Sequence, residues 1–125
     1  MLHGLITGSL ASWYYGVAPK LAQSHQVTLF DMRGHGLSGR SPTGYDSLTL
    51  AEDLDAVISS YADEQTVSLV GHSYGALVAL KFALAQPERV HRLALIDVPL
   101  PPSRAGDINE FMKRGPEDML DALPE

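Results

Sequence analysis

The chain has 125 residues, which is enough for one domain with a modest hydrophobic core. Its net charge of −6, with nine scattered Lys and Arg residues, argues against nucleic acid or an anionic membrane surface as a partner. The absence of cysteine excludes disulfides, zinc–thiolate sites and a cysteine nucleophile, and it fits a cytoplasmic setting. No apolar run approaches the length of a membrane span, and no signal peptide precedes the first motif, so we expect a soluble globular protein.

The first forty residues predict alternating strands and helices. Residues 1–2 resemble the end of a strand and lead into a loop over residues 3–9. Apolar side chains recur at helical spacing over residues 10–21. Residues 26–30 are β-branched and aromatic, which predicts a buried parallel strand, and a glycine-punctuated loop over residues 31–40 follows it.

The middle of the chain has the clearest helical periodicity. Between residues 50 and 61 apolar side chains fall at i, i+4, i+7, i+8 and i+11, one stripe of an amphipathic helix. Thr49 and Glu52 have the spacing of a capping box at its start. A strand over residues 66–70 and an almost wholly apolar helix over residues 74–86 follow.

Residues 93–97 predict the next strand, and prolines then turn the chain away from the sheet. The character changes over residues 103–125, where two short amphipathic helices are expected. Alternating strands and helices predict an α/β fold, with a parallel sheet of about three to four strands flanked by helices. We therefore expect a core over residues 1–102 and the beginning of a separate element over residues 103–125.

The most informative pattern is Gly71-x-Ser73-x-Gly75, which lies between the strand expected at residues 66–70 and the helix expected at residues 74–86. A serine at such a junction occupies a sharp, strained turn with positive φ that exposes its hydroxyl above the sheet. A Cβ atom two residues to either side would collide with the adjacent helix and strand, which explains the two glycines.

Four segments in this order resemble the α/β-hydrolase superfamily: His3-Gly4, Asp31-x-Arg33-Gly34-x-Gly36-x-Ser38, Gly71-His-Ser-Tyr-Gly75 and the segment from Pro87 to Asp97. The resemblance covers roughly residues 1–100, and it is strongest to the esterase, lactonase, dehalogenase and C–C hydrolase branch that carries a helical cap. It implies that Ser73 is a nucleophile and that the backbone amides of Leu5 and Tyr74 form an oxyanion hole. It also implies a small-molecule acyl substrate, with no cofactor and no metal, and assigns residues 103–125 to the start of the cap.

The resemblance further implies that the chain is a partial core. Complete members are roughly twice as long, in line with single α/β domains of about 200–250 residues. Their first two strands and most of the third would precede Met1, and the catalytic histidine and its usual acid would follow Glu125. We therefore expect the isolated chain to be inactive, because Ser73 would have no base to take its proton.

None of the five histidines has the sequence position of the family base. His3 is expected to shape the loop that holds Leu5, and His72 to point to the face opposite Ser73. His35 follows a strand at the carboxyl edge and could approach the site, but a solvent-exposed loop histidine is the simpler interpretation. His25 and His91 precede strands and are expected at the opposite end of the sheet.

Among the carboxylates, Asp97 ends a strand on the site side of the sheet. It is either the acid of the triad, as in some relatives, or a cap for the turn into Pro99, and we favour the cap. Asp31 and Arg33 are expected to fix loop geometry, whereas Asp53 is expected to be solvated on the outer face of its helix.

Three functions remain compatible with these patterns. A serine hydrolase and an acyltransferase both need an acyl-serine, whereas a non-catalytic binding module would use the same core without turnover. The sequence does not identify the substrate or the oligomeric state, although exposed sheet edges favour self-association.

Overall fold

The computed structural model describes residues 1–6, 8–62 and 65–98. In chain order the elements are α1 (Ala11–Tyr14), α2 (Ala18–Leu21), α3 (Ser47–Ser59), β1 (Val67–His72), α4 (Tyr74–Ala85), the 3-10 turn η1 (Pro87–Arg89) and β2 (Val90–Ile96). Their alternation confirms the α/β class. The helices expected within residues 103–125, and the boundary at residue 102, lie outside the described residues. No helix in the described part of the chain is long and apolar enough to cross a membrane.

The sheet is parallel, as predicted, and β1 pairs with β2 along its whole length. On the other edge of β1, Leu2 forms an isolated parallel bridge to Gly71. The Leu2 amide donates to the Val70 carbonyl at 2.8 Å, and the His72 amide donates to the Leu2 carbonyl at 3.1 Å. The described residues thus contain two strands and a one-residue bridge, fewer than the three to four strands expected.

Residues 26–30, which were predicted to be a strand, form none in the structure. One hydrogen bond joins this segment to its neighbour, from the Met1 amino group to the Thr28 carbonyl at 2.8 Å. A groove of about 590 Å³ separates it from the first half of β1 and is lined by Val27, Phe30 and Leu69, among other residues. The β-branched residues therefore have the right propensity, but among the described residues no strand forms a ladder with them.

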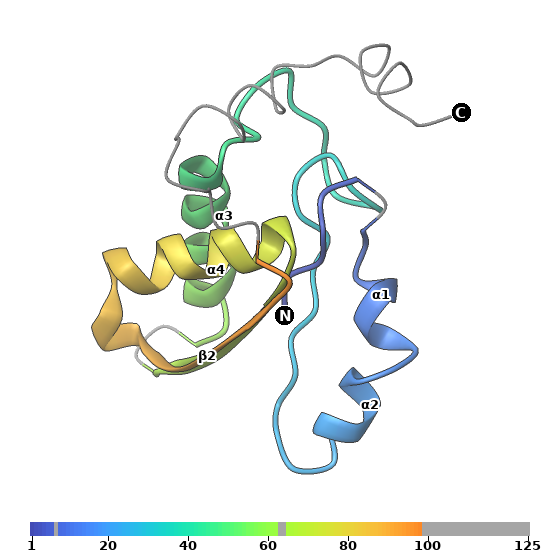
Figure 1. Ribbon diagram of the computed structural model, residues 1–125, viewed down its shortest axis with the longest axis vertical. Helices are drawn as coiled ribbons and strands as arrows, with labels where there is room; N and C mark the ends of the chain where they lie inside the picture. The colour runs from blue at the N-terminus through green and yellow to red at the C-terminus, as the bar shows by residue number, and fades with distance from the viewer. Residues whose placement is uncertain (7, 63–64, 99–125) are drawn as a thin grey trace.

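The core lies where α4 packs on the sheet and α3 packs beside α4 (Figure 1). Val78 and Phe82 of α4 and Ile58 of α3 are almost completely buried there. Because α4 contacts both the sheet and α3, its first six residues are all buried, which explains their apolar sequence, whereas Leu84 in its second half is 71% exposed. Burial of such side chains stabilises the fold by about 1.5–3 kcal/mol each.

The start of α3 differs from the predicted capping box at Thr49 and Glu52. Asp46 is the N-cap residue, and its carboxylate accepts hydrogen bonds from the amides of Leu48 and Thr49 at 3.1 and 3.0 Å. The Thr49 hydroxyl also donates to this carboxylate, at 2.8 Å. An aspartate is a strong N-cap residue, so the helix begins one turn earlier than the box predicts, at Ser47.

The helix expected over residues 10–21 is divided into α1 and α2. The break falls at Tyr15 and Gly16, just before Pro19, the second residue of α2. A proline at that position lacks only an amide that the first turn would leave unpaired, so the chain restarts a helix there after the turn.

Candidate active site

Ser73 occupies the turn between β1 and α4, as predicted from the two flanking glycines. Its backbone has φ 52° and ψ −123°, a conformation that favours glycine. The Ser73 amide donates to the Ile96 carbonyl at 2.8 Å, which ties the turn to the end of β2. Holding a serine in this region stores roughly 1–3 kcal/mol of strain, which the surrounding contacts must offset.

The glycines on either side of Ser73 allow backbone segments to meet without side chains between them. A Cβ atom on Gly71 would lie 2.6 Å from the Ala76 Cα atom in α4. A Cβ atom on Gly75 would lie 2.9 Å from the Leu2 carbonyl carbon. Both distances are shorter than side chains tolerate, which confirms the expected reason for the glycines.

Residues 3–6, here called the donor loop, pass beside Ser73. A Cβ atom on Gly4 would lie 3.5 Å from the Ser73 Cβ atom and 3.3 Å from Nδ1 of His72. Leu5 follows Gly4, and Tyr74 follows Ser73, so the two candidate oxyanion residues are chain neighbours of this close contact. Whether both amides aim at the Ser73 hydroxyl stays a prediction.

His3 shapes the donor loop from within the core, where its side chain is completely buried. Its Nε2 accepts a hydrogen bond from the Met32 amide at 3.0 Å, so the ring proton lies on Nδ1. Nδ1 then donates to the Gly4 carbonyl at 2.7 Å. Burial lowers the pKa of His3, which favours the neutral ring that this arrangement requires.

His35 is half-buried, and the expectation that it is a solvent-exposed loop histidine is wrong. Its Nδ1 lies 2.9 Å from the Arg33 carbonyl, and its Nε2 contacts the Leu5 carbonyl of the donor loop. Its ring also lies beside that of His3, with the centroids 4.9 Å apart. Sequence reasoning missed this contact because it joins residues 30 positions apart.

The remaining histidines form no hydrogen bond with Ser73 in the structure. His72 lies against Gly4 of the donor loop. His25 and His91 are exposed and lie toward the start of the strands, away from Ser73. All five histidines of the chain are described, and none hydrogen-bonds Ser73.

Asp97 follows β2 directly and has a positive φ of 50°. It is exposed, and the bond from the Ser73 amide to Ile96 places it one residue from the serine turn. Its role as acid or as cap is untested, since Pro99 lies outside the described residues. Over residues 1–6, 8–62 and 65–98, no three His, Asp or Glu side chains converge as metal ligands do.

Residues 31–39, here called the support loop, are held by Asp31 and Arg33. The Asp31 carboxylate accepts from the amides of Leu10 at 2.7 Å and Leu37 at 3.1 Å. Burial alone would raise the pKa of Asp31, but these two hydrogen bonds outweigh it and hold the pKa below its ordinary value. Arg33 donates to both carboxylate oxygens of Asp53 at 2.6 Å.

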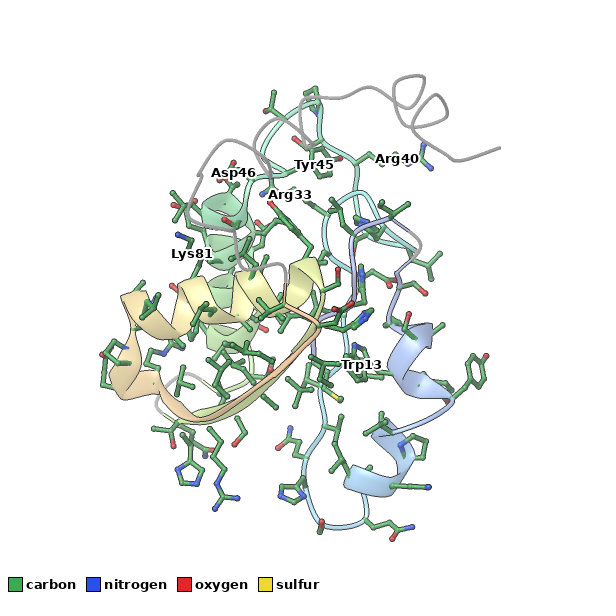
Figure 2. All side chains as sticks on the ribbon, viewed as in Figure 1. Trp13, Arg33, Arg40, Tyr45, Asp46 and Lys81 are labelled. Atoms are coloured by element: carbon green, nitrogen blue, oxygen red, sulfur yellow. The ribbon has the colours of Figure 1, made fainter. Side chains whose placement is uncertain are left out.

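Both residues therefore fix loop geometry, as predicted, but Asp53 is an ion-pair partner and not merely a solvated side chain. In Figure 2, Arg33 lies with Tyr45 and Asp46 at the amino-terminal end of α3, whereas Arg40 points away from the fold. The same pairing anchors the support loop to the helix that contacts α4.

Comparisons with known proteins agree with this architecture. The family model of the α/β hydrolase fold matches residues 1–125. A soluble epoxide hydrolase from Corynebacterium sp. strain C12 is 35% identical over 105 residues, covering 82% of this chain and 36% of the relative. A putative carbamate hydrolase from Cronobacter turicensis is 33% identical over 98 residues, covering 78% of this chain and 36% of the relative.

Among solved structures, an esterase from a marine microorganism superposes with a TM-score of 0.76 at 30% identity, over 98% of this chain and 46% of that one. An epoxide hydrolase superposes with the same TM-score at 35% identity. The chain spans less than half the length of each of these relatives. With its serine turn and donor loop, the chain belongs to the α/β hydrolase fold family.

Proposed function

We propose that this chain carries the nucleophile and the oxyanion loop of a serine hydrolase that acts on small acyl compounds such as esters or lactones. The observation that carries the proposal is the strained Ser73, with φ 52°, at the junction of β1 and α4. The donor loop lies against it, since a Cβ atom on Gly4 would be 3.5 Å from the Ser73 Cβ atom. Strain kept at a half-buried polar side chain beside a loop points to a functional role.

In this reaction the Ser73 oxygen adds to the substrate carbonyl carbon while its proton passes to a base. The carbonyl oxygen becomes an oxyanion, which the amides of Leu5 and Tyr74 would stabilise, and loss of one such donor typically costs about 3–4 kcal/mol. The positive end of α4, which begins at Tyr74, adds to this stabilisation. The intermediate then expels an alkoxide, and water hydrolyses the acyl-serine.

A serine nucleophile favours acyl substrates over epoxides, although some of the relatives are named as epoxide hydrolases. Attack of a serine oxygen on an epoxide carbon forms an ether, which water does not readily cleave, so the enzyme would not turn over. Attack on an ester, lactone or carbamate carbonyl forms an acyl-serine, which water does cleave. The esterase and the carbamate hydrolase among the relatives carry names that fit this chemistry.

The isolated chain is expected to hydrolyse activated esters little faster than water does. None of its five histidines hydrogen-bonds Ser73. Assistance by a positioned general base is commonly worth about 10²–10⁴-fold in rate. What the chain contributes on its own is a half-buried serine and the neighbouring amides, which favour slow but selective reaction at Ser73.

The test treats the chain and its Ser73→Ala variant with a fluorophosphonate and locates the adduct by mass spectrometry. We expect a slow adduct on Ser73, little reaction at the other serines and none at position 73 of the variant. Adducts spread evenly over exposed serines would contradict the assignment of Ser73 as nucleophile. In parallel, rapid p-nitrophenyl acetate hydrolysis that the variant loses would show that a base acts within these residues.

A further inference from the structure

The contact between His35 and the Leu5 carbonyl joins the support loop to the donor loop. His35 is half-buried, and its two ring nitrogens lie near two different backbone carbonyls, those of Arg33 and Leu5. A neutral ring carries one N–H and can donate to only one of them. The first carbonyl belongs to its own loop and the second to the loop beside Ser73. The ring therefore lies between the two loops and can fix the position of one relative to the other.

The support loop is firmly held, so it can serve as a fixed reference. The Gly34 amide donates to the Gly39 carbonyl at 2.8 Å, which closes the loop on itself. The Asp31 carboxylate accepts from the Leu37 amide, and the His35 amide donates to the Met32 carbonyl at 3.0 Å. Both the backbone of His35 and the loop around it are thereby fixed.

The donor loop, in contrast, contains a peptide unit that can rotate easily. The Leu5 amide belongs to the peptide that follows Gly4, and a glycine places few limits on that rotation. In a trans peptide the C=O and N–H groups point in opposite directions, so holding one aims the other. His3 holds the Gly4 carbonyl at 2.7 Å, and His35 contacts the carbonyl of the next peptide, at Leu5.

We propose that His35 is a positioning residue: its Nε2–H holds the Leu5 carbonyl, in the peptide after Leu5. The Leu5 amide belongs to the preceding peptide, which His3 holds, so the two histidines together fix both sides of Leu5 and keep its amide turned toward Ser73. The inference rests on the proposed function, because it concerns the aim of a proposed oxyanion donor. Such donors stabilise a transition state only when they are held in place before the reaction.

The alternative is that His35 only staples its own loop through Nδ1 and the Arg33 carbonyl. The two roles use different nitrogens, so substitutions separate them. In His35→Gln the side-chain amide extends to about the position of Nε2 and keeps a donor for Leu5. In His35→Asn the amide reaches only about as far as Nδ1 and keeps a donor for Arg33. His35→Phe removes both, and His91→Gln, at an exposed site, is the matched control.

The experiment uses the whole 125-residue chain and two measurements. The first is hydrogen exchange of the Leu5 and Ile6 amides, followed by NMR. The second is the rate at which a fluorophosphonate labels Ser73. We expect the Asn and Phe variants to exchange faster at Leu5 and Ile6 and to lose about tenfold in labelling rate, part of the 10²–10³-fold that complete loss of a donor gives. The Gln variant and the control should stay within about twofold of wild type.

If the Gln and Asn variants show equal effects, or if the Gln variant shows the larger effect, the proposal is wrong and His35 only holds its own loop through Nδ1. If Ser73 is not labelled even in the wild type, the proposed function fails, while the order of exchange rates still decides the role of His35. Should the variants not fold, the tautomer of the His35 ring in the wild-type chain tests the proposal. Its ¹⁵N shifts at a pH where the ring is neutral must show the proton on Nε2, and a proton on Nδ1 alone would refute the proposal.

Discussion

Replacing Gly71 by alanine inserts a methyl group into a close contact between β1 and α4. The new Cβ atom would lie 2.5 Å from the Gly75 carbonyl oxygen, 2.6 Å from the Ala76 Cα atom and 2.7 Å from the Ala76 nitrogen. Carbon atoms pack at about 3.5–4.0 Å, so the two elements must separate by about 1 Å. All three neighbours are backbone atoms, and no side-chain rotation can relieve the clash.

Overpacking of a core typically costs about 1–3 kcal/mol, and we expect a value near 3 kcal/mol because only backbone movement is available. That is a large fraction of the roughly 5–15 kcal/mol that stabilises a domain. For a chain of 125 residues it corresponds to a decrease in Tm of about 11 °C.

Thermal unfolding followed by far-ultraviolet circular dichroism measures this decrease. The matched control is Gly16→Ala, because a Cβ atom on Gly16 meets no heavy atom within 4 Å. The control should change stability by less than about 1 kcal/mol, and reduced freedom of the unfolded chain favours a small gain. If the two variants unfold at the same temperature, the close approach of β1 to α4 is not present in solution, and the derived geometry of the Ser73 turn is wrong.

Two further predictions concern backbone strain and helix capping. Ser73→Gly should raise the free energy of unfolding in urea by about 1 kcal/mol, because glycine accepts φ 52° without strain. Ser73→Ala should give no such gain. Equal effects of the two substitutions would contradict the strain at position 73. Asp46→Ala should cost about 1 kcal/mol at neutral pH through loss of the α3 cap. Hydrogen bonds from the Thr49 amide and hydroxyl hold the pKa of Asp46 below its ordinary value. Its contribution is therefore present above the unfolded pKa of about 3.9 and lost as pH falls through the lower folded value. Urea unfolding at neutral pH and at about pH 3 measures this, and a difference between wild type and variant that persists undiminished in acid would refute the capping role.

The elements that could be predicted from the sequence are those whose residues carry their own signal. The apolar run over residues 74–86 predicted α4, and the glycines around Ser73 predicted both the turn and its positive φ. These features depend on contacts close in sequence or on steric limits that only glycine meets. The parallel pairing of β1 with β2 followed from the helix between them, since a crossover connection requires parallel strands.

The errors share a different cause, which is competition between neighbouring signals or dependence on distant partners. Thr49 and Glu52 have the spacing of a capping box, yet Asp46 caps the helix three residues earlier and accepts the Thr49 amide that the box would use. Residues 26–30 have strand propensity, but a strand exists only where a neighbour pairs with it. Asp53 lay on the expected outer face, and only the approach of the support loop supplies Arg33 as its partner.

The candidate site shows the same division. Ser73 and the donor loop were identified from local patterns, whereas the buried tautomer of His3 depends on the Met32 amide, 29 residues away. The interaction of His35 with Leu5 likewise requires two loops to meet. No periodicity or spacing within either loop encodes such a meeting, so only the folded structure reveals it.

The close approaches around Ser73 form a consistent arrangement. Gly4, Gly71 and Gly75 each lack a Cβ atom at a place where one would be in contact with a neighbouring segment. The residue they surround, at φ 52°, is the one position of this turn where glycine would also relieve strain, yet it is a serine. A fold selected only for stability would place glycine there, because the hydroxyl of Ser73 makes no hydrogen bond within the described residues that would offset the strain. The side chain therefore supports the proposal of chemistry at its hydroxyl, for which the donor loop beside it, held by His3, would supply a backbone amide.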